Sequence, residues 1–194
     1  MKNINRFTLA VLFAFFIGAH FQSFCMPQAA SPISSLDNSP ELQNPVFDNE
    51  DFGDAPESPS GAYPTTLFHN GARHTIVPGV FLGSQVDFEP DGQPGINADC
   101  DDTDCLFPSL GDDEDGVGMP STVSAGATVD LSVTASVAGF LDAWMDFNLL
   151  NGWADAGEHI FMDTPLTAGP NALSFVVPAN AVPGQSYVRF RFRD

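Results

Sequence analysis

Eleven carboxylates fall between Asp87 and Asp115, and no Lys or Arg lies among them. No basic side chain of the segment neutralises this charge, so the sequence predicts that a bound cation does. The acids alternate with Gly, Pro and Asn, which let a loop turn its oxygens inward. Oxygen ligands at this density suit Ca²⁺, which takes about six to eight of them. The alternative is a solvated, disordered acidic loop. The predicted calcium ligands are Asp87, Glu89, Asp91, Asp99, Asp101, Asp102, Asp104, Asp112, Asp113, Glu114 and Asp115.

The N-terminus has the layout of a secretory signal. Lys2 and Arg6 precede an apolar run from Phe7 to Ala19, which is too short to span a bilayer. We therefore predict a signal peptide over residues 1–26 and an extracellular or cell-surface location, with no membrane span in the mature chain. Residues 27–45 are rich in Ser, Pro, Asn and Gln, and we expect a disordered linker there.

Cysteine usage agrees with export. Cys100 and Cys105 are separated by four residues, and in an oxidising compartment this spacing favours one disulfide that holds the acids between them together. Zinc is an alternative, but four-coordinate zinc needs two more Cys or His ligands, and the remaining His residues are scattered. Lipidation at Cys25 is a second alternative, although the residues before it do not match a lipidation signal.

The overall charge restricts the partners. The formal net charge is −19, and removal of residues 1–26 leaves four basic residues against 25 acidic ones. Nucleic acids and anionic membranes require basic surface, so neither is an expected partner. Repulsion among so many negative charges destabilises a compact state, so we expect bound cations to stabilise the folded chain.

Hydrophobic patterning divides the rest of the chain in two. Residues 46–120 form an acidic, loop-rich segment in which only Thr75–Val77, Val80–Leu82 and Gln85–Phe88 are expected to be short strands. Residues 121–194 instead alternate apolar and polar side chains, which indicates half-buried strands. The apolar positions are Val129, Leu131 and Val133; Leu141, Ala143, Met145 and Phe147; Leu173, Phe175 and Val177; and Val188, Phe190 and Phe192. We predict an all-β fold, an antiparallel β-sandwich of immunoglobulin-like or jelly-roll-like type.

The last predicted strand, Tyr187 to Arg193, alternates up to the final residue without a closing turn. We expect it to lack a neighbour on one side, and the sandwich to be incomplete at the C-terminus. Arg189, Arg191 and Arg193 would line one face. They form either a solvated edge that discourages strand addition or a partner for the acids of the preceding loops.

A second candidate metal site follows the Leu141–Phe147 strand. The loop starts like a calcium loop of the Asp-x-Asn type, with Asp146 and Asn148 able to supply oxygens to one ion. Leu150 stands where an EF-hand has its third ligand, so a true EF-hand is not expected. The prediction is a looser site formed by Asp146, Asn148, Asp155 and Glu158.

The order of these motifs resembles bacterial secreted proteins with a GEVED domain. The resemblance implies an extracellular β-sandwich module of a large surface or secreted protein, without enzymatic activity. Such chains continue beyond the Arg-rich strand into a Gly-Glu-Val-Glu-Asp strand, so the resemblance also implies that this chain is a fragment. The matching segments are Asp51–Pro56, Gly71–His74, Leu82–Gly83, Val86–Pro94, Gly111–Val117, Trp144–Asn148 and Trp153–Glu158.

Three functions fit the sequence. The favoured one is a non-catalytic extracellular module, stabilised by calcium, that serves adhesion or acts as a spacer, with other domains of a surface protein as partners. A carbohydrate-binding module is the alternative, because the rings of Trp144, Trp153 and Tyr63 are able to stack on sugars or extracellular glycans. A hydrolase that pairs Asp146 with Glu158 or Asp155 is a third reading, but no other catalytic motif accompanies the pair.

Overall fold

The computed structural model describes residues 2–9, 49–57, 63–100, 115–150 and 152–194. The predicted linker lies outside this set, as do most of the predicted signal, Cys105, and the acids Asp101, Asp102, Asp104, Asp112, Asp113 and Glu114. The described elements are β1 (Lys2–Leu9), β2 (Glu50–Asp51), η1 (Leu67–His69), β3 (His74–Thr75), β4 (Val117–Gly118), β5 (Thr122–Val123), β6 (Thr128–Ala135), β7 (Gly139–Met145), β8 (His159–Leu166), β9 (Gly169–Val176) and β10 (Gly184–Arg193).

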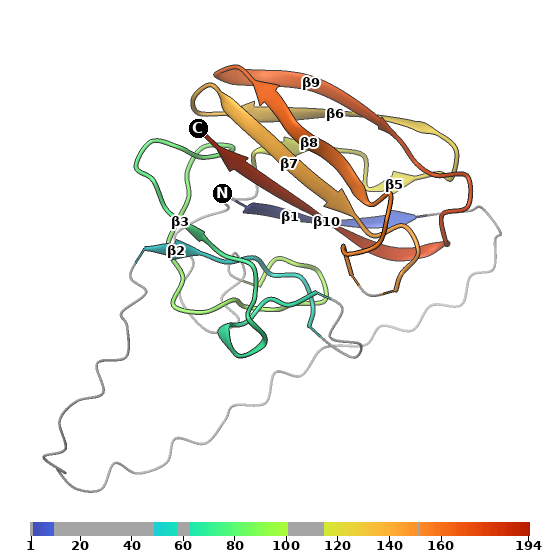
Figure 1. Ribbon diagram of the computed structural model, residues 1–194, viewed down its shortest axis with the longest axis horizontal. Coiled ribbons are helices and arrows are strands. Elements are labelled where there is room, and N and C mark those ends of the chain that lie inside the picture. Colours follow the sequence, from blue (N-terminus) through green and yellow to red (C-terminus); the bar gives the residue numbers. More distant parts are fainter. Residues whose placement is uncertain (1, 10–48, 58–62, 101–114, 151) are drawn as a thin grey trace, which may run out of the picture.

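The described chain is mostly β, which confirms the predicted fold class at that level. The strands form a five-stranded sheet in the order β5-β1-β10-β7-β8, a three-stranded sheet in the order β4-β6-β9, and a small β2-β3 pair (Figure 1). All strand pairs are antiparallel except β1 with β5. Within the described residues, no helix is long and apolar enough to cross a membrane.

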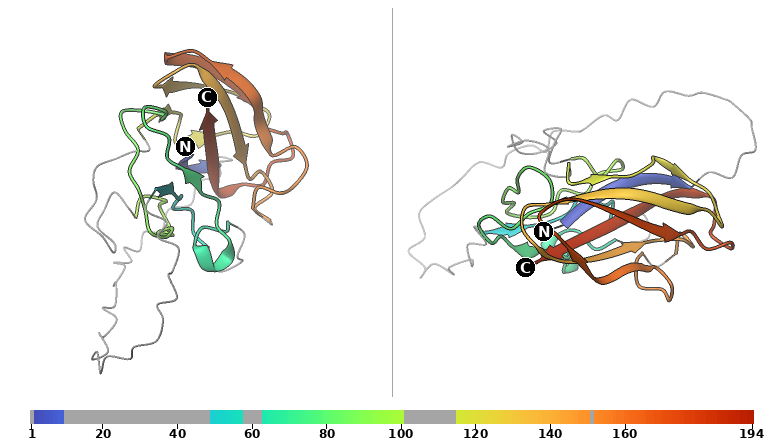
Figure 2. Two further views of the ribbon diagram at one scale, coloured as in Figure 1. Left: turned by 60° about the vertical axis from the view of Figure 1, so that its left-hand side comes forward. Right: turned by 90° about the horizontal axis from the view of Figure 1, so that it is seen from above.

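The two larger sheets share one hydrophobic core. Alternation places every second side chain of a strand on the same face, and those faces are buried here. From the three-stranded sheet come Val129, Leu131, Val133 and Phe175, and from the five-stranded sheet come Leu141, Ala143, Met145, Phe161, Val188, Phe190 and Phe192. Figure 2 shows the two sheets as neighbouring layers, with the loop-rich segment to one side.

The four long strands predicted from alternation are present as β6, β7, β9 and β10. β8 was not predicted, because its sequence does not alternate. Asp163 has a positive φ of 45°, and the pairing of β8 with β7 shifts register beside Leu141 and Ala143. A bulge of this kind inserts a residue and breaks the two-residue period on which the prediction rests.

The short strands predicted in the loop-rich segment are largely absent. His74–Thr75 forms β3, but Val80–Leu82 contributes only an isolated bridge from Leu82 to Ala135, and 85–88 is not a strand. Pro78 and Gly79 interrupt the run, and Gly79 has a positive φ of 83°.

The final strand has a neighbour on both sides, which differs from the expected open edge. β10 pairs with β7 along one edge and with β1 along the other, in a register from Gly184 opposite Leu9 to Arg191 opposite Lys2. The neighbour β1 belongs to the predicted signal peptide. In the structure this segment lies between β10 and β5 and joins them into one sheet.

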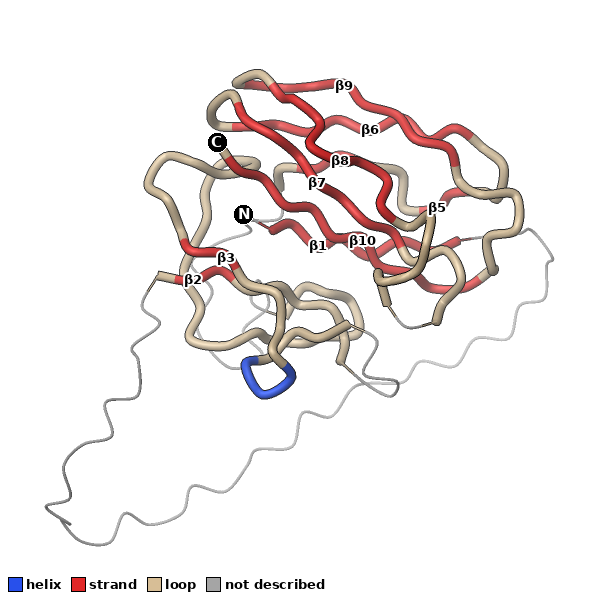
Figure 3. Tube along the Cα trace, in the orientation of Figure 1, coloured by secondary structure: helices blue, strands red, loops and turns tan. Residues whose placement is uncertain are grey.

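The loop-rich segment packs against the β10 side of the five-stranded sheet. A second apolar cluster joins the two, with Ala55, Tyr63 and Ala98 on one side and Trp153 and Tyr187 on the other. The Tyr187 hydroxyl donates to the Ile96 carbonyl at 2.8 Å. Apart from β2, β3, β4 and the η1 turn, the described part of this segment is irregular (Figure 3).

Candidate functional site

The four residues predicted as a loose metal site lie together in the β7–β8 loop. Asp146 directly follows β7, and Glu158 directly precedes β8, so the antiparallel pairing of the two strands brings both ends of the loop together. The Met145 amide donates to the Glu158 carbonyl at 2.9 Å. Asn148 and Asp155 occupy the loop between them, and the Asn148 side-chain amide donates to Asp155 Oδ2 at 2.7 Å.

Asp146 is completely buried and both of its carboxylate oxygens accept hydrogen bonds. Oδ1 accepts from the amides of Asn148 at 3.1 Å and Leu149 at 2.6 Å, which holds the chain reversal after β7. Oδ2 accepts from the hydroxyl of Tyr63 at 2.5 Å. Burial and this carboxylate raise the pKa of Tyr63, so Tyr63 remains a donor. The contact links the β7–β8 loop to the loop-rich segment.

Glu158 is the second buried carboxylate of the loop, only 2% exposed. Its Oε1 accepts from the Phe147 amide at 3.0 Å and its Oε2 from the Asp155 amide at 3.3 Å. Burial raises the pKa of Glu158 to about 7, and the charges of Asp146 and Asp155 add to that shift, although the two amide hydrogen bonds oppose it. The Glu158 carboxyl is therefore expected to change its protonation state near neutral pH.

In these contacts the carboxylate oxygens of the loop accept hydrogen bonds, mostly from backbone amides, and do not converge on one point where an ion would sit. In the described part of the chain, no three His, Cys, Asp or Glu side chains gather into a group that could hold a metal ion. A cation at this loop would displace amide donors from Asp146 and Glu158. The oxygens of the loop thus do not form a ready calcium cage, and calcium binding there remains a prediction.

The acidic segment repeats the same use of carboxylates. Glu89 is buried and accepts from the Phe52 amide at 2.9 Å and from the Gln93 side chain at 3.2 Å. Asp91 Oδ1 accepts from the amides of Leu67 at 2.6 Å and Gly92 at 2.9 Å. Asp115 Oδ1 accepts from the Ser84 amide at 2.9 Å. The predicted ligands Asp87 and Asp99 are partly buried, and the other six predicted ligands lie outside the described residues.

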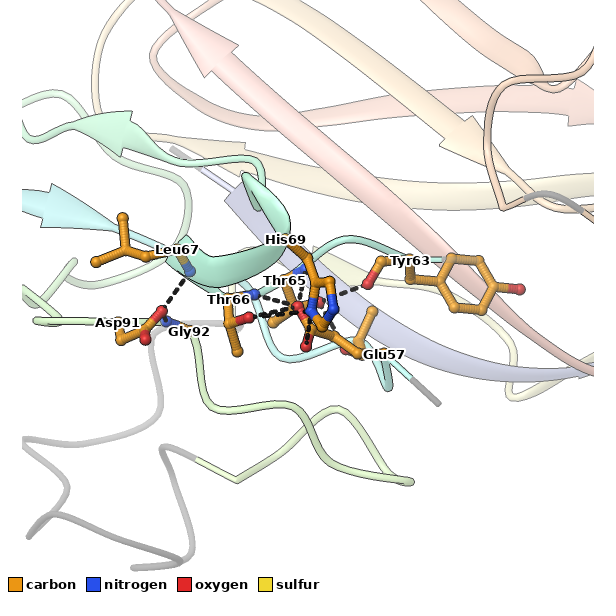
Figure 4. A network of polar contacts seen from close by, with 9 residues as sticks. Glu57, Tyr63, Thr65, Thr66, Leu67, His69, Asp91 and Gly92 are labelled. Carbon is orange, nitrogen blue, oxygen red and sulfur yellow. Dashed lines mark hydrogen bonds and ion pairs between the residues drawn. The ribbon is translucent and has the colours of Figure 1, made fainter. Parts of the chain in front are cut away.

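Glu57, which the sequence did not single out, makes the densest of these networks. Its Oε1 accepts from the amides of Thr65 and Thr66 and from the Thr66 hydroxyl, and its Oε2 lies 2.7 Å from Nδ1 of His69 (Figure 4). Burial raises the pKa of Glu57, but the hydrogen bonds from Thr66, Thr65 and His69 outweigh it and the net shift is downward. Nothing in the local sequence marks this Glu, because its partners lie eight to twelve residues away.

The backbone is closely packed around this network. Thr65 is buried, and its hydroxyl donates to the Ala55 carbonyl at 2.7 Å. A Cβ added to Gly71 would lie 1.9 Å from the Thr65 carbonyl oxygen, and one added to Gly92 would lie 2.4 Å from it. Only glycine allows two chain segments to approach so closely at these positions.

Of the three aromatic rings proposed for sugar stacking, Tyr63 and Trp153 are packed inside the molecule and Trp144 is partly buried. Tyr63 and Trp153 are 8% and 9% exposed, and their ring centroids are 4.6 Å apart. Arg189 lies over the Trp153 ring at 4.0 Å, and Trp144 stacks on His159 at 4.4 Å. Trp153 and Tyr63 thus form no exposed platform for a sugar. Asp146 and Glu158, the proposed hydrolase pair, are also buried beneath the loop that they organise.

The predicted disulfide joins Cys100 to Cys105, and Cys105 lies outside the described residues. Cys100 is partly buried, and its sulfur packs closely against Gly95, where an added Cβ would lie 2.7 Å away. The bridge between Cys100 and Cys105 stays a prediction.

Comparison with known proteins returned no matching family model, no matching curated protein and no matching solved structure.

Proposed function

We propose that this chain is a non-catalytic extracellular module, a β-sandwich of immunoglobulin-like or jelly-roll-like type that calcium stabilises and that serves adhesion or spacing in a bacterial surface or secreted protein. The secretory layout of the N-terminus and the motif order shared with GEVED-domain proteins support the location and the class. Two sheets around one core support the architecture.

The non-catalytic role is supported by the way the loops use their carboxylates. Six described carboxylates, those of Glu57, Glu89, Asp91, Asp115, Asp146 and Glu158, accept hydrogen bonds from backbone amides of the loops. A carboxylate used in this way organises the chain and has fewer oxygens left for substrate chemistry. Charge-assisted bonds of this kind are stronger than neutral ones, which suits a module whose loops lack regular structure.

Charge balance supports the calcium part. Organising loops with carboxylates concentrates negative charge, and the formal net charge of the chain is −19. Cations that bind the folded state and not the unfolded chain stabilise folding by mass action. The predicted ligands are the acids of the 87–115 segment, where glycines and prolines let oxygens converge on an ion.

Calcium titration calorimetry tests the proposal. We expect saturable heat with Ca²⁺ and much weaker binding of Mg²⁺, because Mg²⁺ demands tighter octahedral geometry. The variant that combines Asp101→Asn, Asp102→Asn and Asp104→Asn should lose a site. Asp130→Asn, an exposed acid on β6, is the matched control and should retain full binding. Absence of saturable calcium binding in the wild-type chain contradicts the proposal.

A further inference from the structure

The face of β10 that points away from the shared core carries a row of three arginines, each opposite a residue of β7. Arg189 lies opposite Trp144, Arg191 opposite Asp142, and Arg193 opposite Phe140. In a chain with six basic residues against 25 acidic ones, this row concentrates half of the basic side chains on one strand. The row therefore creates a local positive region on an acidic protein.

Two of the three guanidinium groups are engaged with neighbouring side chains. Arg189 lies 4.0 Å over the ring of Trp153. Arg193 forms an ion pair with Asp163 and lies 4.9 Å over Phe140. Arg191 differs from both, because no hydrogen bond or ion pair among the described residues involves its guanidinium, and it is exposed.

A cavity of about 130 Å³ opens beside Arg191. Its lining consists of His74 from β3, Asp142 from β7, and Arg191, Phe192 and Arg193 from β10. A single water needs only about 10–15 Å³ of such space, so the cavity has room for a group of several non-hydrogen atoms. It lies where the loop-rich segment meets the five-stranded sheet.

Of the other titratable groups in the wall, Asp142 has partners outside the cavity and His74 is uncharged at neutral pH. Asp142 Oδ1 lies 3.1 Å from His159 Nε2 and accepts from the Asp163 amide at 3.1 Å. Burial lowers the pKa of His74 to about 4, and the positive charge of Arg191 adds to the effect. His74 is consequently a neutral ring at pH 7 and adds no charge to the cavity wall.

From this arrangement we propose that the cavity binds a carboxylate group, anchored on the guanidinium of Arg191. A guanidinium presents parallel N–H donors that match the two oxygens of a carboxylate, and such pairs are stronger than neutral hydrogen bonds. Asp142 in the same wall disfavours a second negative charge, so the site prefers a monocarboxylate to a dicarboxylate or a sulfate dianion. Acidic sugars and the C-terminus of a peptide both carry this group.

Chemical-shift titration of the full chain tests the proposal, with the His74 ring and the Arg191 side chain as reporters. The probes are sodium acetate, sodium glucuronate and a short peptide with a free C-terminus. Acetamide, glucuronate methyl ester and the amidated peptide are the matched controls, all at constant ionic strength. We expect saturable chemical-shift changes with the three carboxylates and none with their uncharged controls. Whichever of glucuronate and the peptide has the lower dissociation constant indicates whether the ligand is an acidic sugar or a peptide C-terminus.

Two variants make the result specific to the arginine. Arg191→Gln should weaken acetate binding about tenfold or more, and Arg191→Lys should have an intermediate effect because the charge remains but the paired donors are lost. Thr128→Glu on β6 changes the net charge by the same amount at an exposed site far along the chain, and it should bind like the wild type. Equal binding by Arg191→Gln and the wild type, or equal shifts with acetate and acetamide, overturns the proposal. Neither outcome bears on calcium binding.

Discussion

At the scale of single residues, this chain uses acidic side chains where other proteins use secondary structure. Buried backbone amides need acceptors, and an irregular segment has no strand ladder to supply them. Glu89 supplies the acceptor for Phe52, 37 residues away, and Asp91 supplies it for Leu67, 24 residues away. The acids therefore act as long-range connections between loops.

Removing one of these acceptors should destabilise the fold. Glu57→Ala leaves the amides of Thr65 and Thr66 without their acceptor, and unsatisfied buried groups cost about 1–3 kcal/mol. We expect a loss of that size in the free energy of unfolding from urea titration. Asp130→Ala, at an exposed position of β6, is the control and should change stability by less than about 0.5 kcal/mol. Equal stability of the two variants contradicts this reading of Glu57.

Glu158 should make stability depend on pH. Its folded pKa of about 7 exceeds the ordinary value of 4.5, so the folded state binds more protons between these values. The contribution is fully present below about pH 4.5 and is lost as pH rises through 7. The shift corresponds to at most about 3 kcal/mol, which solvent screening reduces.

Glu158→Gln isolates this contribution, because Gln keeps an acceptor for the Phe147 amide without a titrating charge. The difference in unfolding free energy between variant and wild type should shift in favour of the variant as pH rises from 4.5 to 7. A difference that is constant over this window would show that Glu158 does not titrate in the folded state.

At the scale of elements, the sequence predicts strands well where a single rule governs them. Val129, Leu131 and Val133 alternate because one face of β6 meets the core, and the prediction for this strand is confirmed. β8 escaped prediction because the Asp163 bulge breaks the alternation. The proximity of Asp146, Asn148, Asp155 and Glu158 was predicted from spacing, but the role of Tyr63 was not, since it lies 83 residues from Asp146 and no local pattern connects them.

The position of β1 leads to a prediction about the chain without residues 1–26. β1 covers β10 over eight residue pairs and belongs to the predicted signal peptide. Deletion of residues 1–26 should uncover this edge of β10, and uncovered edges promote pairing with other chains. We expect lower stability and concentration-dependent association of the shortened chain in analytical ultracentrifugation. A monomeric shortened chain with the stability of the full chain would show that β1 contributes nothing at this edge.

At the scale of the whole molecule, charge and architecture oppose each other. One apolar core between two sheets favours the compact state, whereas 25 acidic residues against six basic ones favour expansion. Among the described residues, basic side chains pair with acids in four places: His69 with Glu57, Arg73 with Glu50, His159 with Asp142, and Arg193 with Asp163. Six basic side chains cannot neutralise 25 acidic ones, so ions from the medium are expected to balance the remaining charge.

We propose that calcium, rather than ionic strength alone, stabilises this fold. Thermal unfolding of the full chain in millimolar Ca²⁺ and in chelator, at equal ionic strength, tests it most directly. Calcium at about 100 times its dissociation constant should add about 2.7 kcal/mol to the free energy of unfolding and raise the melting temperature. Identical melting temperatures in the two solutions would contradict the account.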